Sequence, residues 1–471
     1  MKPLAALVLP AVRWDAERGF APALPALEQA LALGVGGVII FGGEREAVAR
    51  LSADVASGSR HPLLVASDFE RGAGQQVAGL TALPPALAVA SLGDEALADA
   101  ATITAAEARD VGVSWALAPV VDLDVEPANP IVQTRSLGED PEAVGRGAFA
   151  WISACQASGV LACAKHFPGH GRTTADSHAE LPVVSAPRAA LEADLAPYRW
   201  AVRAGVAGVM SAHVAYPALD RSGRAATHSR PILDDVLRHE LAFDGLVVTD
   251  ALIMEGALHG AGEQAGAVLA VQAGCDLLLY PHDVPGVVAA LERAAASGAL
   301  ERGRLEASLG RRLAAAGHAS GPRRLDAAQL ARHGERARAL ATAAVRLLRG
   351  ERAAPPRALD LEIVDDDAGG TYPVPPRTAF AEELARRGVS VEPGAERIVA
   401  LFADVKGGKG RATLAAATRR SLAAALAAPA TVVLFGHPRL LAEVPGGGPV
   451  WCAWSGDVPM QRAAAERLLA G

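Results

Sequence analysis

Eight short, almost entirely apolar segments recur along the first 281 residues, and segments with helical spacing lie between most of them. Parallel strands that are covered on both faces are apolar at nearly every position, so these segments are typical of such strands. They are LAALVLP (4–10), VGGVIIF (35–41), LLVASD (63–68), WALAPVVD (115–122), VLACAKHF (160–167), GVMSAHV (208–214), GLVVTD (245–250) and DLLLYP (276–281). The intervening helical patterns include 94–111, 139–158, 187–204 and 261–273. Eight strands alternating with helices over about 280 residues predict a (β/α)₈ barrel of the TIM type, and a doubly wound open sheet is the alternative.

The rest of the chain predicts a second, smaller α/β unit. From about residue 290 to residue 349 the composition is helical, and a Pro-containing stretch, GERAAPPRAL (350–359), follows. Four further apolar runs alternate with Ala-rich helical patterns: 358–364, 397–403, 431–436 and 449–454. We therefore expect a catalytic barrel over 1–340, a linker over 341–357 and a C-terminal α/β sandwich domain over 358–471.

Charge and cysteine content exclude several classes of protein. Lys and Arg number 45 and Asp and Glu number 52, a net charge of −7, which argues against a dedicated nucleic-acid binder. The short apolar run at the N-terminus ends at Pro10 and is followed by charged residues, unlike a signal peptide. No apolar stretch approaches the length of about 18 residues that a membrane span needs. We therefore expect a cytoplasmic protein. We also expect no disulfides, since no C-x-x-C pair and no disulfide framework is apparent among its four cysteines (Cys155, Cys163, Cys275 and Cys452).

Polar residues fall where the apolar segments end. Asp68, Asp122, Lys165 with His166, His213 and Asp250 all lie at or just after the carboxyl end of a predicted strand. In a barrel these ends converge on one face, which is the face that carries catalysis. His213 could either pack and hydrogen-bond there or contact the substrate directly.

The segment KHFPGHGRTTADSH (165–178) carries the strongest chemical signal. Its Pro and Gly residues predict a turn directly after the strand. Asp176 and His178 follow, and in an extended segment residues two apart point the same way. A carboxylate in that place can orient the imidazole and favour its protonated form, so His178 is a candidate general acid. An isolated D-x-H would more often be a surface pair, and the surrounding motif is what argues for catalysis.

Asp250 ends the seventh predicted strand, in GLVVTDALIMEGAL. A carboxylate in this place is often only the N-cap of the following helix. The functional alternative is a nucleophile that attacks an anomeric carbon and forms a glycosyl ester, as in a retaining glycosidase.

The string KHFPGHG-x-T-x-x-DSH, with VVTDALIMEGA about seventy residues later, resembles glycoside hydrolase family 3, and within it the β-N-acetylglucosaminidase (β-hexosaminidase) branch. The resemblance extends over about residues 1–340. It implies that Asp250 is the nucleophile, that His178 is the general acid/base and that Asp176 is its partner. It also implies that four residues bind the sugar: Asp68, Arg135, Lys165 and His166.

One segment departs from the family pattern D-x-E-G-G-x-V-x-R. This chain has DFERGAGQQ, with Arg71 in place of one glycine and Gln76 where the family has a substrate-binding Arg. Gln76 keeps hydrogen-bonding capacity and loses the charge. Glu70 is expected to support the loop that bears Asp68, and Met254 to pack near the site.

The sequence therefore predicts a retaining exo-glycosidase for terminal β-linked N-acetylglucosamine, with a possible place in the recycling of peptidoglycan fragments. No metal site, cofactor, nucleic acid or membrane partner is expected, and the protein would be a monomer or homodimer acting on a small carbohydrate. Three alternatives remain. They are a β-N-acetylglucosaminide phosphorylase, a β-glucosidase-type exo-hydrolase, and a non-catalytic sugar-binding protein, which the presence of Asp176, His178 and Asp250 disfavours.

Overall fold

A computed structural model of the chain describes residues 4–175, 180–258, 262–351, 355–367, 374–404 and 409–470. Every one of the eight apolar segments contains a strand, as predicted. These strands are β1 (Val8–Leu9), β3 (Gly37–Phe41), β4 (Leu64–Ser67), β5 (Trp115–Ala116), β6 (Cys163–Phe167), β7 (Gly208–Ser211), β8 (Leu246–Thr249) and β9 (Leu278–Leu279). A short strand that the sequence did not predict, β2 (Ala11–Arg13), follows β1.

The strands of this region form three sheets, and all the pairings within them are parallel. Their orders are β1-β9, β2-β3-β4-β5 and β6-β7-β8. Isolated parallel bridges, Trp115 to Leu161 and Val248 to Leu277, lie between the sheets. The α/β class with parallel sheets is thus confirmed, whereas a single closed sheet is not shown.

Side chains along these strands alternate between two apolar clusters, as a period of two requires. In β3, Ile39 belongs to an inner cluster, while Val38 and Ile40 belong to an outer cluster shared with the helices. The inner cluster receives buried side chains from all eight predicted strands, including Leu9, Trp115 and Leu279. Burial on both faces is the reason why these segments are apolar throughout.

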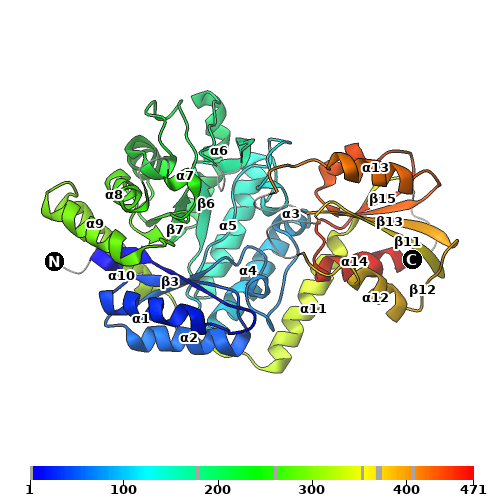
Figure 1. Ribbon diagram of the computed structural model, residues 1–471, viewed down its shortest axis with the longest axis horizontal. Helices are drawn as coiled ribbons and strands as arrows, with labels where there is room; N and C mark the ends of the chain where they lie inside the picture. Colours follow the sequence, from blue (N-terminus) through cyan, green and yellow to red (C-terminus); the bar gives the residue numbers. More distant parts are fainter. Residues whose placement is uncertain are drawn as a thin grey trace.

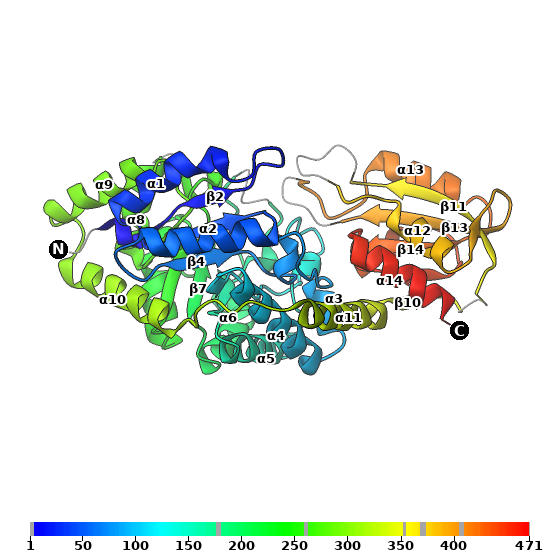
Figure 2. The same ribbon diagram turned by 90° about the horizontal axis from the view of Figure 1, so that it is seen from below.

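Helices cover the outside of these strands (Figures 1 and 2). The helices of this part of the chain are α1 (Leu24–Leu33), α2 (Arg45–Gly58), α3 (Ala86–Ala90), α4 (Asp94–Asp110), α5 (Pro141–Ala157), α6 (Arg188–Arg203), a π-helix (Pro231–Glu240), α7 (Glu255–Leu258), α8 (Glu263–Ala273), α9 (Val284–Ala296) and α10 (Arg302–His318). Among the described helices, none is both long enough and apolar enough to cross a membrane.

The C-terminal part forms a six-stranded sheet in the order β10-β15-β14-β13-β11-β12. Its strands are β10 (Arg346–Arg349), β11 (Ala358–Asp365), β12 (Ser390–Val391), β13 (Glu396–Ala403), β14 (Thr431–Gly436) and β15 (Val450–Cys452). Only β10 runs antiparallel to its neighbour, β15. Helices α12 (Ala379–Arg386) and α14 (Val458–Leu469) share one apolar cluster with the sheet, and α13 (Ala416–Ala425) shares another.

Residues that we expected to form a linker are partly structured. Helix α11 (Ala327–Ala344) extends into the range 341–357, and β10 pairs with β15 inside the same range. The reason is apolar burial, because Ala341, Ala344 and Val345 belong to the same cluster as α12 and α14. Helix α11 leads to the six-stranded sheet in both views (Figures 1 and 2).

A buried charge cluster joins the C-terminal sheet to the first part of the chain. Asp124 accepts a hydrogen bond from His437 Nε2 at 2.9 Å and from Arg439 Nη1 at 2.7 Å. The Nδ1 atom of His437 accepts the backbone N–H of Arg439, which leaves Nε2 as the donor to Asp124. His437 and Asp124 are both buried, so neither partner could find water if the other were removed.

The variant Asp124→Ala is therefore expected to loosen the C-terminal sheet. Removal of one partner from a buried pair costs about 3 kcal/mol, so amide exchange in the 431–443 segment should become much faster, as measured by hydrogen–deuterium exchange. Asp99→Ala, which breaks an exposed pair with Arg336, is the matched control and should change exchange little. Unchanged exchange in Asp124→Ala would show that this cluster does not hold the sheet in place.

Candidate active site

A cavity of about 560 Å³ lies where the carboxyl ends of the parallel strands meet. Asp68 follows β4, Lys165 and His166 are in β6, and Asp250 follows β8. All four line this cavity, together with Arg135 and Gln76. Of the six residues at the predicted strand ends, Asp68, Lys165, His166 and Asp250 line the cavity, whereas Asp122 and His213 are not part of its lining.

An ion-pair network organises one wall of the cavity. Lys165 Nζ lies 2.8 Å from Asp68 Oδ1 and 2.7 Å from Glu70 Oε1. Glu70 also accepts two hydrogen bonds from the Arg135 guanidinium, at 2.9 and 2.8 Å. Glu70 thus bridges the two cations. This role is larger than the support of the Asp68 loop that the sequence suggested for Glu70.

The network fixes the charge of its members. Burial on its own would lower the pKa of Lys165, but the carboxylates of Asp68 and Glu70 raise that pKa above its ordinary value. Burial would raise the pKa of Glu70, but Arg135 and Lys165 hold it well below its usual range. At neutral pH the wall therefore presents fixed cations and carboxylates, which suits the paired hydroxyls of a sugar.

The ring of His166 is held by the carboxylate of Asp122. The sequence placed Asp122 at the end of a predicted strand but indicated no partner for it. The Nδ1 atom of His166 lies 2.7 Å from Asp122 Oδ2, and Asp122 Oδ1 accepts the backbone N–H groups of His166 and His170 at 3.0 and 2.7 Å. Asp122 is buried, and although burial would raise its pKa, attraction to His166 and these hydrogen bonds lower it. With Nδ1 directed at Asp122, the Nε2 atom of His166 faces Asp250, 4.0 Å away from Oδ2.

Asp250 presents its carboxylate to the cavity. Oδ1 accepts the backbone N–H of Ala251 at 2.7 Å, and the side chain is 21% exposed. Burial would raise the pKa of Asp250, but attraction to His166, together with His213, the backbone N–H of Ala251 and the charge of Lys165, lowers the pKa. A carboxylate that stays ionised and faces an open cavity has the charge state that a nucleophile needs.

Comparison with known proteins identifies the family. The model of the glycosyl hydrolase family 3 N-terminal domain matches residues 20–315. The chain belongs to glycoside hydrolase family 3. It is therefore a glycoside hydrolase, as the sequence predicted.

Named relatives agree with this assignment. A β-hexosaminidase from Bordetella avium is 39% identical over 258 residues, covering 52% of this chain and 73% of the relative. A β-hexosaminidase from Thiobacillus denitrificans is 36% identical over 273 residues, covering 55% and 75%. The structure of a family 3 β-N-acetylglucosaminidase from Paenibacillus sp. FPU-7 matches with a TM-score of 0.86 and 28% identity, over 100% of this chain and 96% of that one. A β-glucoside phosphorylase, at 21% identity and a TM-score of 0.87 over 100% and 92%, shares the fold.

Two of the candidate catalytic residues of this hydrolase, Asp176 and His178, lie outside the described residues. The segment that leads to them is well anchored. Arg172 Nε donates to Asp194 at 2.6 Å, and the Tyr216 hydroxyl donates to the Gly169 carbonyl at 2.8 Å. A Cβ on Gly171 would lie 1.8 Å from the Leu123 carbonyl oxygen, so only glycine fits this turn.

His213 lies behind the cavity rather than in its lining. The ring is buried, its Nδ1 is 2.9 Å from Thr227 Oγ1, and its Nε2 is 3.1 Å from the Ala251 carbonyl. Burial lowers the pKa of His213, which favours a neutral ring that donates from Nε2. Of the two roles open for His213, the geometry gives it hydrogen bonding beneath the Asp250 segment and offers no direct contact with the cavity.

The departures from the family motif have separate consequences. Gln76 lines the cavity, and its Oε1 accepts the Gly42 N–H at 3.1 Å. Arg71 points elsewhere, to the C-terminal part of the chain, where its guanidinium lies 3.0 Å from Asp457. The extra charge of Arg71 therefore ties the loop that carries Asp68 and Glu70 to the start of α14.

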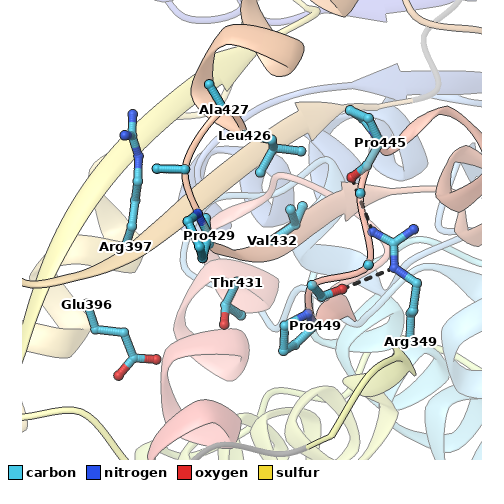
Figure 3. A pocket seen from close by; sticks show the side chains of 15 residues that line it. Arg349, Glu396, Arg397, Leu426, Ala427, Pro429, Thr431, Val432, Pro445 and Pro449 are labelled. Carbon is cyan, nitrogen blue, oxygen red and sulfur yellow. Dashed lines mark hydrogen bonds between the residues drawn. The ribbon is translucent and has the colours of Figure 1, made fainter.

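A second cavity, of about 610 Å³, lies on the C-terminal unit and has a different character (Figure 3). Its lining is largely Ala, Pro and Gly, and Glu396 is its one carboxylate among the described residues. The guanidinium of Arg349 is occupied by the carbonyl oxygens of Gly448, Val444 and Pro445. A lining of this kind lacks the pair of catalytic groups that glycoside hydrolysis uses.

The variant Asp122→Asn tests how much the site depends on the support of His166. The amide keeps the shape of the side chain but replaces one acceptor oxygen with an NH₂ donor. That donor would face the N–H groups of His166 or His170, which need an acceptor. Loss of a hydrogen bond to a charged group costs about 1.5–3 kcal/mol, so we expect kcat/KM to fall by about 10- to 100-fold on a chromogenic β-glycoside. Asp54→Asn, an exposed position on α2, is the control. Equal kcat/KM for Asp122→Asn and the wild type would show that the site does not depend on the hydrogen bonds of Asp122 to His166.

Proposed function

We propose that the protein is a retaining exo-glycosidase that releases terminal β-linked N-acetylglucosamine. The observation that carries the proposal is the ionised carboxylate of Asp250 facing a cavity whose wall holds Asp68, Lys165, His166 and Arg135. The similarity to β-hexosaminidases and to a structurally similar β-N-acetylglucosaminidase supports the choice of sugar.

The proposed reaction has two displacements. In the first, an oxygen of Asp250 attacks the anomeric carbon, the glycosidic C–O bond breaks, and His178 gives its proton to the leaving oxygen. In the second, His178 takes a proton from water, the water oxygen attacks the anomeric carbon, and the ester to Asp250 breaks. Asp176 would orient His178 and stabilise its protonated form.

Binding roles follow from the geometry of the wall. Lys165 and Arg135 would donate to sugar hydroxyls, and Asp68 would accept from a pair of them. His166, oriented by Asp122, directs Nε2 at the space beside Asp250. Gln76 would supply an uncharged amide where the family motif has an arginine.

The architecture that supports this site is also part of the proposal. We propose that the three parallel sheets together form a (β/α)₈-type barrel, because one inner apolar cluster receives side chains from all eight predicted strands. The proposed division is a barrel over 1–340 and an α/β sandwich over 358–471, with β10 belonging to the sheet of the second unit. A cytoplasmic location and a place in peptidoglycan recycling remain predictions.

Two enzymatic alternatives use the same residues. In a phosphorylase, phosphate would replace water in the second displacement, so sugar 1-phosphate would appear only when phosphate is present. A β-glucosidase-type enzyme would prefer the p-nitrophenyl glucoside over the N-acetylglucosaminide. Our proposal requires the opposite preference and free N-acetylglucosamine as the product.

Covalent trapping tests the proposed nucleophile. Incubation with a 5-fluoro-N-acetylglucosaminyl fluoride should leave one sugar bound per chain, and peptide mapping by mass spectrometry should place it on Asp250. Fluorine destabilises the oxocarbenium-like transition states, so the ester should persist long enough to be detected. Asp250→Asn is the control and should not be labelled. A label on any other residue, or efficient labelling only by the corresponding fluoroglucosyl fluoride, would contradict the proposal.

A further inference from the structure

The chain turns soon after β6, and buried hydrogen bonds hold this turn (169–173). The backbone N–H of His170 donates to Asp122 Oδ1 at 2.7 Å. The side-chain amide of Asn129 donates to the His170 carbonyl at 2.9 Å and to Thr173 Oγ1 at 3.2 Å. Asp122 and Asn129 both lie in the segment that follows β5, and all four residues are buried. The segment after β5 therefore fixes one side of the turn.

Helix α6 supplies an ion pair to the same turn. Arg172 Nε donates to Asp194 Oδ2 at 2.6 Å, and Arg172 Nη2 donates to the Ala190 carbonyl of the same helix at 3.3 Å. Asp194 packs closely on the turn, because a Cβ on Gly169 would lie 2.9 Å from the Cβ of Asp194. The Asp194 side chain is only 2% exposed, so without Arg172 its charge would lose its compensation.

The charge of Asp194 depends on this partner. Burial raises the pKa of Asp194 to about 6, and the negative charge of Asp122 acts in the same direction. The hydrogen bond and the charge of Arg172 act to lower that pKa. At slightly alkaline pH Asp194 is therefore ionised, and its hydrogen bond with Arg172 is charge-assisted, which makes it roughly twice as strong as a neutral one.

The ion pair stands apart from the cavity but close in the chain to the proposed proton donor. Neither Arg172 nor Asp194 lines the cavity, and Asp250 is held independently by the backbone N–H of Ala251. In the sequence, Arg172 is followed four residues later by Asp176 and six residues later by His178. A change at Arg172 therefore acts first on the segment that carries the proposed acid/base and only indirectly on the nucleophile.

We propose that Asp194 and Arg172 are positioning residues for the proton-transfer step of the reaction. Asp194 fixes Arg172, and through it the start of the segment that carries His178. The proposal rests on the function proposed above and deepens it, since it gives this pair the placement of the proton donor. General acid catalysis contributes about 10²- to 10⁴-fold to a rate, and it requires the donor within hydrogen-bonding distance of the leaving oxygen.

Leaving groups of different basicity measure this step. The 2,4-dinitrophenyl N-acetyl-β-D-glucosaminide releases a phenolate that leaves without a proton, whereas the phenyl N-acetyl-β-D-glucosaminide depends on protonation of its leaving oxygen. Arg172→Met keeps an unbranched side chain of similar length and removes its donors. At slightly alkaline pH, kcat/KM of this variant should fall about tenfold further on the phenyl substrate than on the dinitrophenyl substrate.

Two more variants accompany this measurement. Asp194→Asn keeps the shape of the side chain and removes its charge, so the ratio of the two kcat/KM values should change in the same direction as in Arg172→Met. Glu192→Gln is the matched control, because it weakens exposed pairs with Arg188 and Arg199 on the same helix. The control should keep the wild-type ratio.

Two readouts separate positioning from a general loss of structure. The double variant Arg172→Met/Asp194→Asn should lose no more activity than the more affected single variant, since both changes break one interaction. Sodium azide should accelerate the turnover of the dinitrophenyl substrate by Arg172→Met and yield the glycosyl azide. The azide anion attacks the anomeric carbon of the glycosyl ester without a general base, so it bypasses a misplaced His178. Azide should leave Glu192→Gln unchanged.

The proposal is overturned if Arg172→Met and Asp194→Asn, both folded by their thermal melts, keep the wild-type ratio for the two leaving groups. His178→Ala distinguishes this result from failure of the proposed function. If His178→Ala loses activity equally on both substrates, His178 is not the general acid and the proposed function is contradicted. A larger loss on the phenyl substrate in His178→Ala, without one in Arg172→Met or Asp194→Asn, would contradict the positioning role alone.

Discussion

Glu70 is the residue on which the geometry of the site depends most. Its carboxylate lies between the ammonium group of Lys165 and the guanidinium of Arg135, and all three side chains are largely withdrawn from water. A buried ammonium group is unfavourable unless carboxylates and hydrogen bonds compensate for its lost hydration. Glu70 supplies that compensation for two cations at once, so Lys165 can remain charged at the end of β6 next to the cavity.

The rest of the site extends this arrangement outward from the ion pairs. Asp122 accepts three N–H groups and orients His166, and His213 holds the carbonyl of the residue after Asp250. These contacts place donors and acceptors before a sugar arrives, which is the main way in which a protein stabilises developing charge. Arg71 contacts Asp457 at the start of α14, and Asp124 contacts Arg439 after β14, so the second unit bears on the region that carries Asp68 and Glu70.

Local patterns in the sequence were enough for much of the fold and for part of the lining of the cavity. The strands could be predicted because burial on both faces leaves only apolar side chains, and the ends of those strands carried Asp68, Lys165, His166 and Asp250. The short strands β2, β10 and β12 were missed, because most of their residues are partly or fully exposed and do not form a continuous apolar run. Whether the sheets close into one barrel could not be read from the apolar period, because an open parallel sheet has the same pattern.

Contacts between distant residues were also beyond the sequence. Lys165 and Asp68 are 97 positions apart, and His437 and Asp124 are 313 apart, so no spacing rule links them. Glu70 bridges its two cations, and Asp122 supports His166, only because the fold brings the ends of separate strands together. The interior position of His213 has the same origin, because the end of a strand can direct a side chain either into the cavity or behind it.

Glu70 organises the proposed sugar-binding wall, and the variant Glu70→Gln tests this role most directly. Glutamine keeps the size of the side chain and removes the charge that Lys165 and Arg135 share. The measurement is kcat/KM on p-nitrophenyl N-acetyl-β-D-glucosaminide, with Glu46→Gln on the exposed face of α2 as the control. We expect a fall of about 100-fold or more, since breaking a buried ion pair costs about 3–5 kcal/mol. A folded Glu70→Gln enzyme with kcat/KM within threefold of the wild type would contradict this role of Glu70.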